Sequence, residues 1–373
     1  MTANIDTRTV ESSDAAEIYI SATPKEPGPF EDQARQAFSG IRDTLRSRKA
    51  YLLQERVFAT QEVMKRVLRA RSEAYGDTDD GVAPSALCGA EGTVGPFTGV
   101  QIHAVTCDTR LEVVSLEGTP CGRIVRVPGR VFVSLSNISA PQFTEATEQA
   151  RAMMEKGESV LKELGADFLC VPRTWMWLRD ILSWYGDFNH VRNTFFTERG
   201  LIGQGSRQSM PASTGIGVYS ADGSKCAMDL IAVLEPADSI QYLAAVGKQQ
   251  CALEYGSAFS RASRAATPAA ETVFVSGTAS IDASGATTNV GDAVGQINAT
   301  IENVRAVLRD MQVNDEDVVQ VMSYCKTTEV ERIFNDIRGR LPWPWVTAIC
   351  DICRPDLLFE IEATAVPASS TKA

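Results

Sequence analysis

The last hundred residues contain three apolar stretches that decide the fold: VFVSGTASI (273–281), VTAICDIC (346–353) and LLFEIEATAV (357–366). Each stretch is typical of a β-strand. The segment between the first and the second follows a helix, strand, helix pattern, with one helix around residues 296–303. This order predicts an α+β unit in which two helices cover one face of a sheet. The other face is apolar and must be covered by something else.

The same pattern occurs twice more along the chain. With an offset of 131 residues, Phe359-Glu360-Ile361 aligns with Met228-Asp229-Leu230, and PWPW (342–345) aligns with PAST (211–214). A weaker copy at the front is predicted from a strand over 17–21, helices over 30–48 and 61–75, and strands over 51–58 and 100–105. We therefore expect three internal repeats that cover one another's sheets as a pseudo-trimer within a monomer. The expected boundaries are a flexible N-terminus (1–16), units over 17–115, 120–236 and 270–367, and a linker over 237–269.

Composition narrows the classes of function. The 373 residues carry a net charge of −11, which argues against nucleic acid and anionic membranes as partners. No stretch approaches the ~18 apolar residues of a membrane span, and the polar N-terminus does not resemble a signal peptide. Nine scattered cysteines indicate a reducing, cytoplasmic location. No cofactor motif is present, and the pair Cys350 and Cys353 has no second ligand pair, so neither a cofactor nor a metal is expected.

The element order, the SG(T/Q) strand and the terminal EIEA strand resemble the YjgF/Rid family. That resemblance implies active sites at clefts between three copies of the fold. In the imine deaminases of this family, an arginine located 15 residues before the cleft glutamate binds the substrate carboxylate. Here Glu360 matches the glutamate, and Trp345 occupies the position of the arginine. Because only a guanidinium offers the required fork of donors, simple imine hydrolysis is not expected.

Other segments resemble one branch of that superfamily, the chorismatases, which cleave the enolpyruvyl ether of chorismate. These segments are WYGDFNHVRNTFF (184–196), RGLI (199–202), PASTGIG (211–217) and EYGSAFSRA (254–262). The resemblance implies that Glu360 is the catalytic acid. Members that form 3-hydroxybenzoate carry a cysteine seven residues earlier, and this position holds Cys353. The expected products are 3-hydroxybenzoate, with or without 4-hydroxybenzoate, and pyruvate.

The residue types fit this chemistry. Ether cleavage starts when an acid protonates the terminal methylene of the enolpyruvyl group, and an apolar cleft keeps a glutamate protonated near pH 7. A cysteine could add to the ring or steer the intermediate. The two carboxylates of chorismate need cationic partners, and tyrosines could donate hydrogen bonds. The candidate binding residues are Arg173, Arg192, Arg199, Arg261, Tyr185, Tyr255, Asn189 (one helical turn before Arg192) and the cleft-lining Trp345.

Several alternatives stay open at this level. Glu360 and Glu362 share one face of a strand, so spacing does not choose between them. Cys353 could be a small buried hydrophobe, the tryptophans could be core residues, and any of the arginines could form a structural ion pair. The alternative functions are hydrolysis of chorismate to a dihydroxycyclohexadiene carboxylate, and a non-catalytic Rid-like protein that binds metabolites.

Overall fold

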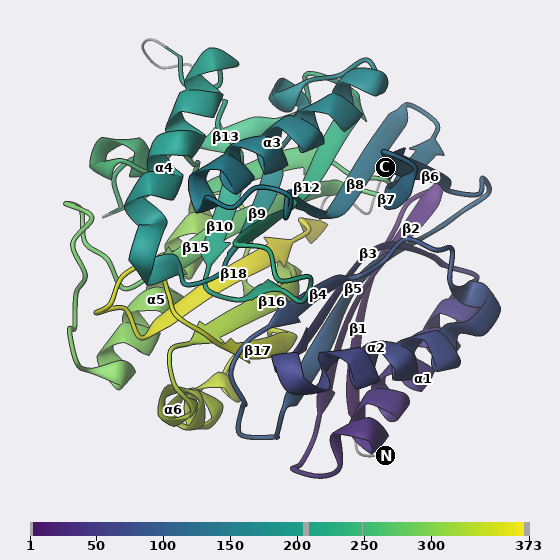
Figure 1. Cartoon of the computed structure of the whole chain (residues 1–373), viewed down its shortest axis with the longest axis horizontal. Coiled ribbons are helices and arrows are strands. Elements are labelled where there is room, and N and C mark those ends of the chain that lie inside the picture. Colours follow the sequence, from purple (N-terminus) through teal and green to yellow (C-terminus); the bar gives the residue numbers. More distant parts are fainter. Residues whose placement is uncertain (1–2, 204–208, 248, 369–373) are drawn as a thin grey trace.

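The computed structural model describes residues 3–203, 209–247 and 249–368, which form three six-stranded sheets with paired helices on their outer faces (Figure 1). The first unit contains β1 (Ala3–Glu11), β2 (Ala15–Pro24), α1 (Phe30–Arg48), β3 (Tyr51–Ala59), α2 (Gln61–Tyr75), β4 (Ser85–Cys88) and β5 (Phe97–Cys107). The second contains β6 (Glu112–Leu116), β7 (Thr119–Val127), β8 (Arg130–Ser139), α3 (Ala146–Glu163), β9 (Arg173–Leu178), α4 (Ile181–Glu198), β10 (Ala212–Ile216), β11 (Tyr219–Ser220) and β12 (Cys226–Glu235). The third contains β13 (Gln241–Leu243), β14 (Ala262–Ala266), β15 (Glu271–Ala279), α5 (Ala293–Asp310), β16 (Val318–Cys325), α6 (Thr328–Arg338), β17 (Trp345–Ile349) and β18 (Phe359–Ala365).

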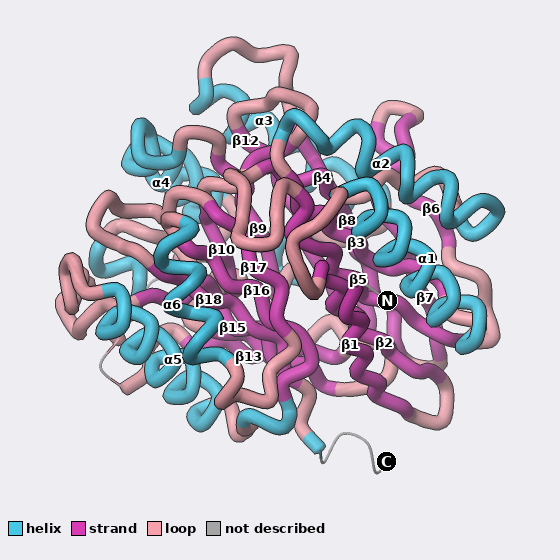
Figure 2. The backbone as a smooth tube through the Cα atoms, turned by 90° about the horizontal axis from the view of Figure 1, so that it is seen from below, coloured by secondary structure: helices cyan, strands magenta, loops and turns pink. Residues whose placement is uncertain are grey.

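The three sheets share one topology, which confirms the predicted repeats. Their strand orders are β1-β2-β5-β3-β4-β11, β6-β7-β8-β12-β9-β10 and β13-β14-β15-β18-β16-β17. In each sheet an opening hairpin is followed by a helix, a strand, a second helix and a strand parallel to the previous one. The last strand then returns antiparallel and lies between the opening hairpin and the first of the two parallel strands. The helix pairs α1/α2, α3/α4 and α5/α6 lie on the outside of the molecule (Figures 1 and 2).

Two predicted boundaries need correction. Residues 3–11 form β1, which pairs with β2 along its whole length, so the prediction of a flexible N-terminus is wrong for this segment. The predicted linker contains β13 and β14, and β14 pairs with β15 as the first core strand of the third unit. Backbone hydrogen bonds can hold a strand in a sheet whatever its side chains are. These strands carry few large apolar residues, so they lack the alternating apolar pattern by which a sequence identifies strands. Strand β17 ends at Ile349, so Cys353 lies in a loop and not on a strand.

The inner faces of the three sheets pack against one another. Phe58 from β3, Trp177 from β9 and Tyr324 from β16 belong to one apolar cluster at their junction, and each is at most 1% exposed. Separate apolar clusters fill the space between each sheet and its own helices. The apolar sheet faces are therefore covered within a single chain, as the hydrophobic effect requires.

Backbone hydrogen bonds also join the units. Strand β11 follows the second unit's β10 in sequence but pairs with β4 of the first unit. Gly217 N donates to Asp351 O (2.9 Å), and Ala90 N donates to Ile349 O (2.8 Å), which brings the second and first units against the third. No helix within the described ranges is long and apolar enough to cross a membrane.

Candidate active site

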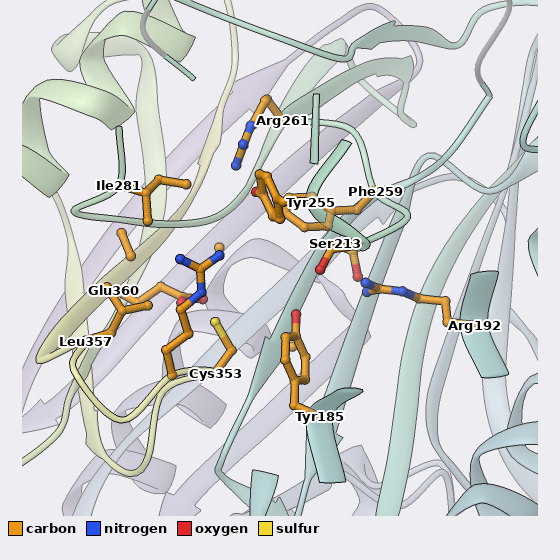
Figure 3. A pocket seen from close by; sticks show the side chains of 15 residues that line it. Tyr185, Arg192, Ser213, Tyr255, Phe259, Arg261, Ile281, Cys353, Leu357 and Glu360 are labelled. Atoms are coloured by element: carbon orange, nitrogen blue, oxygen red, sulfur yellow. The ribbon is translucent and has the colours of Figure 1, made fainter. Parts of the chain in front are cut away.

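A cavity lies where the second and third units meet (Figure 3). Its walls come from α4 and β10 of the second unit, from the segment that precedes β14, and from β15, β18 and the β17–β18 loop of the third unit. The lining residues are Tyr185, Arg192, Ser213, Gly215, Tyr255, Ser257, Phe259, Arg261, Gly277, Ala279, Ile281, Cys353, Arg354, Leu357 and Glu360. Six residues that the sequence nominated therefore lie around one cavity, although they are far apart along the chain.

Glu360 enters the cavity from the second position of β18 and is 4% exposed. Its carboxyl group lies against the backbone of Gly277 on β15, where a Cβ would overlap Glu360 Oε1. Among the described residues, no protein group donates a hydrogen bond to this carboxyl. Burial, and secondly the nearby Glu362 carboxylate, raise the Glu360 pKa to about 8, against smaller opposing effects of Arg173 and Arg354. Glu360 is therefore mostly protonated at neutral pH and has a proton to donate.

Glu360 and Glu362 differ in their surroundings. Both side chains lie on the same face of β18, as the sequence predicted, but only Glu360 lines the cavity. Glu362 Oε2 accepts from Arg173 Nη2 (2.8 Å), and Glu362 Oε1 accepts from Trp175 Nε1 (2.9 Å). Glu362 is thus a buried, ion-paired carboxylate next to the carboxyl that lines the cavity.

Three guanidinium groups face the cavity without an acidic partner within the described parts of the chain. Arg192 Nη2 donates to the Asn189 side-chain oxygen (2.6 Å), and Arg261 donates through Nε and Nη2 to the Gln250 carbonyl (3.2 and 2.7 Å). Arg354 Nη1 donates to the carbonyl of Gly285. Neutral acceptors orient these cations without neutralising them. The cavity is therefore positively charged inside a protein of net charge −11, and it suits an anionic ligand.

Asn189 and Arg354 change the predicted set of binding residues. Asn189 is absent from the cavity lining and acts on Arg192, which it orients by the hydrogen bond described above. Arg354 was missed because it follows Cys353 in an irregular loop, where residue spacing carries no information about direction. Its position next to Cys353 was the available signal.

The two tyrosines line the cavity as predicted. Burial raises the pKa of Tyr185 to about 12 and also raises the pKa of Tyr255, so both hydroxyls keep their protons and can donate hydrogen bonds. The Tyr255 ring lies 5.5 Å from the guanidinium carbon of Arg261 and 5.6 Å from that of Arg354. Tyr185 points its hydroxyl into the cavity opposite Glu360 (Figure 3).

Cys353 lies close to Glu360 with its sulfur directed into the cavity (Figure 3). Burial, followed by the negative charge of ionised Glu360, raises the Cys353 pKa to about 12. The side chain is therefore a neutral thiol at physiological pH, and not a ready-made thiolate nucleophile. Cys350 is buried in the apolar junction of the sheets and, unlike Cys353, does not line the cavity. No cluster of three or more metal-binding side chains occurs in the described ranges.

Besides Asn189, three other nominated residues lie outside the cavity. Arg173 is buried in its pair with Glu362. Arg199 makes a two-pronged ion pair with Glu158 on α3 (both contacts 2.9 Å), far from the site. Trp345 packs edge-on against Phe334, with ring centroids 4.8 Å apart, in the core of the third unit. In each case a partner distant in sequence holds the side chain, so none of the three is placed to contact a ligand in this cavity.

The equivalent position in the second unit has lost its cleft. Asp229, which aligns with Glu360, accepts from Arg56 Nε (3.1 Å), from Ser85 Oγ (2.7 Å) and from the backbone of Asn137 (2.8 Å). An ion pair and two hydrogen bonds thus fill the space that is open next to Glu360. The repeats have diverged, as expected when one chain carries all three copies.

Comparisons with known proteins support the fold. Residues 254–367 match the family model described as Endoribonuclease L-PSP, which spans the third unit and the segment preceding it. The crystal structure of a chorismatase covers 72% of this chain and 82% of its own, with a TM-score of 0.56 and 20% identity. A Mycobacterium tuberculosis protein of the YjgF/YER057c/UK114 family, Rv2704, covers 35% of this chain and 100% of its own, with 21% identity and a TM-score of 0.28. No curated protein matches the sequence. The chain therefore has the fold of a chorismatase and resembles that family.

Proposed function

We propose that the protein is a chorismatase that cleaves the enolpyruvyl ether of chorismate and releases pyruvate. One observation carries the proposal: a buried, protonated carboxyl, Glu360, shares a cavity with three guanidinium groups that have no acidic partner among the described residues. Chorismate combines an acid-labile enol ether with two carboxylates. The two carboxylates of chorismate can pair with the guanidinium groups, and its enol ether can accept the proton of Glu360.

In the proposed reaction, Glu360 donates its proton to the terminal methylene of the enolpyruvyl group. The ether carbon becomes an oxocarbenium ion, and the Glu360 carboxylate remains beside it as its counter-charge. Attack by water at this carbon gives a hemiketal, which breaks the ether bond and collapses to pyruvate. Arg192, Arg261 and Arg354 hold the carboxylates, and their neutral partners keep them oriented.

We further propose that the ring product is 3-hydroxybenzoate, with or without 4-hydroxybenzoate. Formation of the aromatic product requires the ring to lose one water, which balances the water used in ether cleavage. Cys353 supports this outcome because its sulfur shares the cavity with Glu360. As a neutral thiol, it gives up its proton when it bonds to the ring. After ether cleavage the proton of the attacking water has returned to Glu360, which then protonates a ring hydroxyl that leaves as water, and the resulting Glu360 carboxylate takes the thiol proton as the C–S bond forms. Elimination of the thiol together with a ring hydrogen gives the aromatic product and restores Cys353.

The decisive experiment is incubation of the purified protein with chorismate. Pyruvate should be quantified by a coupled lactate dehydrogenase assay, and ring products should be identified by chromatography. Release of pyruvate with 3-hydroxybenzoate is the expected result, and equal pyruvate with the dihydrodiol would select the hydrolytic alternative. Chorismate binding without any pyruvate would contradict the proposal and favour the metabolite-binding protein.

A further inference from the structure

The ion pair between Arg173 and Glu362 lies directly behind the proposed acid. Both side chains are buried, and Glu362 is further fixed by Trp175 Nε1. Burial lowers the Arg173 pKa to about 10, which still leaves the guanidinium charged at neutral pH. An ion pair in a protein interior loses the hydration of both charges, so a pair of apolar residues of similar volume would often be as stable. Its position therefore calls for a role beyond stability.

A short chain of contacts connects this pair with Glu360. Arg173 Nη2 donates to Thr214 Oγ1 (2.7 Å), and the same hydroxyl oxygen accepts from the backbone N–H of Gly277 (3.1 Å). Gly277 is the residue against which the Glu360 carboxyl rests. Glu362 is also two residues from Glu360 on the same face of β18. The pair thus reaches the acid by two routes, one through β10 and β15 and one along β18.

We propose that Arg173 and Glu362 form a positioning pair that holds the Glu360 carboxyl against Gly277 and balances the charges it experiences. Neither residue touches the cavity, so neither is a catalytic residue. The inference deepens the proposed function, because it concerns how the acid of that reaction is kept ready. The sequence nominated Arg173 as a substrate ligand. In this inference Arg173 instead acts through Glu362 and Thr214, without contacting the substrate.

The charges around Glu360 determine how replacing Glu362 or Arg173 should change the Glu360 pKa. Glu362 favours the protonated form of Glu360, whereas Arg173 and Arg354 favour the carboxylate. The other titratable groups that interact with Glu360 are neutral at physiological pH, because burial raises their pKa values: Tyr185, Cys350 and Cys353. Tyr324 on β16 is likewise a neutral phenol that interacts with Glu362. Arg56 on β3 also places its Nη1 3.9 Å from Glu362 Oε1. Removing Glu362 therefore takes away a negative charge and leaves Arg173 without its carboxylate, and both effects favour the carboxylate form of Glu360.

The test compares three variants. Glu362→Gln should lower the Glu360 pKa and move the alkaline limit of kcat/KM down by about one pH unit, which corresponds to a tenfold change in the protonation equilibrium. Arg173→Gln should move the limit upwards. The double variant carries neither charge and should return close to the wild-type profile. If the pair were only structural, the two single variants would not shift the alkaline limit of kcat/KM in opposite directions. The double variant would then be no closer to the wild-type pH profile than the single variants.

A matched control is available in the first unit. Glu55→Gln breaks another buried arginine–carboxylate pair, with Arg71 (2.7 Å), and neither of these residues lines the cavity. This variant should lose stability but keep the wild-type pH profile. Should Glu362→Gln fail to fold, Arg173→Gln carries the test with its opposite shift. Equal pH profiles in wild type and both single variants would overturn the inference.

A second readout separates this inference from the proposed function. Titration of the Glu360 carboxyl by infrared difference spectroscopy, with Glu360→Gln as the reference, needs no substrate. If the wild type releases no pyruvate from chorismate, the proposed function fails, and the carboxyl titrations of the variants still decide the positioning role. If pyruvate is released but the carboxyl pKa is the same in all variants, only the positioning role fails.

Discussion

At the scale of single residues, the proposed chemistry depends on the proton held by Glu360. A glutamate in water has lost this proton near pH 7, whereas burial next to Glu362 keeps it here. The absence of a hydrogen-bond donor to this carboxyl in the described residues matters equally, since a donor would stabilise the carboxylate. The glutamate two positions along the strand shows the opposite case, because Arg173 and Trp175 both donate to it.

Replacement of Glu360 by glutamine removes the transferable proton and keeps the shape of the side chain. We expect Glu360→Gln to lower the rate of pyruvate release by at least ~100-fold. Chorismate affinity, measured by calorimetry, should persist because the three arginines are unchanged. Near-normal turnover in a folded variant would exclude Glu360 as the acid.

The raised pKa of Glu360 also predicts the pH dependence. The acid works only in its protonated form, so kcat/KM should be highest below pH 8 and fall as the pH rises through about 8. Initial rates between pH 6 and 10, in buffers of constant ionic strength, would measure this limb. Activity that increases with pH across this range would mean that the group acts as a carboxylate.

Replacement of Cys353 should affect the ring product more than ether cleavage. Cys353→Ala leaves the proton of Glu360 in place, so pyruvate release should persist. Aromatisation should suffer, and the products should shift towards the dihydrodiol or 4-hydroxybenzoate. Pyruvate and aromatic product should be quantified in the same reaction, with Cys350→Ala as a control outside the cavity. An unchanged product ratio would return Cys353 to a packing role.

At the scale of elements, strand β15 supplies the surface on which the acid rests. Gly277 is required there because a side chain at this position would enter the volume of the Glu360 carboxyl. The strand itself was predictable from its apolar residues, but the contact was not. It joins residues on two strands that pair across a register shift between Val275 and Thr278.

We expect Gly277→Ala to displace the Glu360 carboxyl and to lower kcat at least ~10-fold, since catalysis is sensitive to displacements of about 1 Å. Gly186→Ala is the matched control, because a Cβ there meets no atom within 4 Å and Gly186 lies in helix α4. That control should retain activity and gain slightly in stability, as alanine favours helices. A Gly277→Ala variant with wild-type kcat would show that Glu360 tolerates the displacement.

At the scale of the whole molecule, one chain contains three similar units whose sheets pack against one another. The central cluster draws side chains from all three sheets, so the inner sheet faces of the described residues cover one another within a single chain. The arrangement also lets the units differ. Asp229 forms a buried ion pair with Arg56, whereas the equivalent Glu360 lines a cavity.

The protein should therefore be a monomer in solution. Light scattering coupled to gel filtration should give a mass near 40.4 kDa, that of one chain. Dilution should leave this mass unchanged because the sheet faces are buried within the chain. A trimer mass would contradict the prediction and would mean that a further surface, outside the three sheet junctions, drives association.

The sequence by itself determined the repeated α+β fold, because apolar periodicity and the order of elements are local properties of the chain. It also nominated Glu360 and Cys353 as one pair, which the structure places around one cavity. Only the tertiary structure decided which arginines face that cavity. A guanidinium is directed by its partner, and the partner lies far along the chain: Glu158 for Arg199, and Glu362 for Arg173. The choice between Glu360 and Glu362 depended on the same long-range contacts, because both side chains share one face of β18 and only the neighbouring unit distinguishes them.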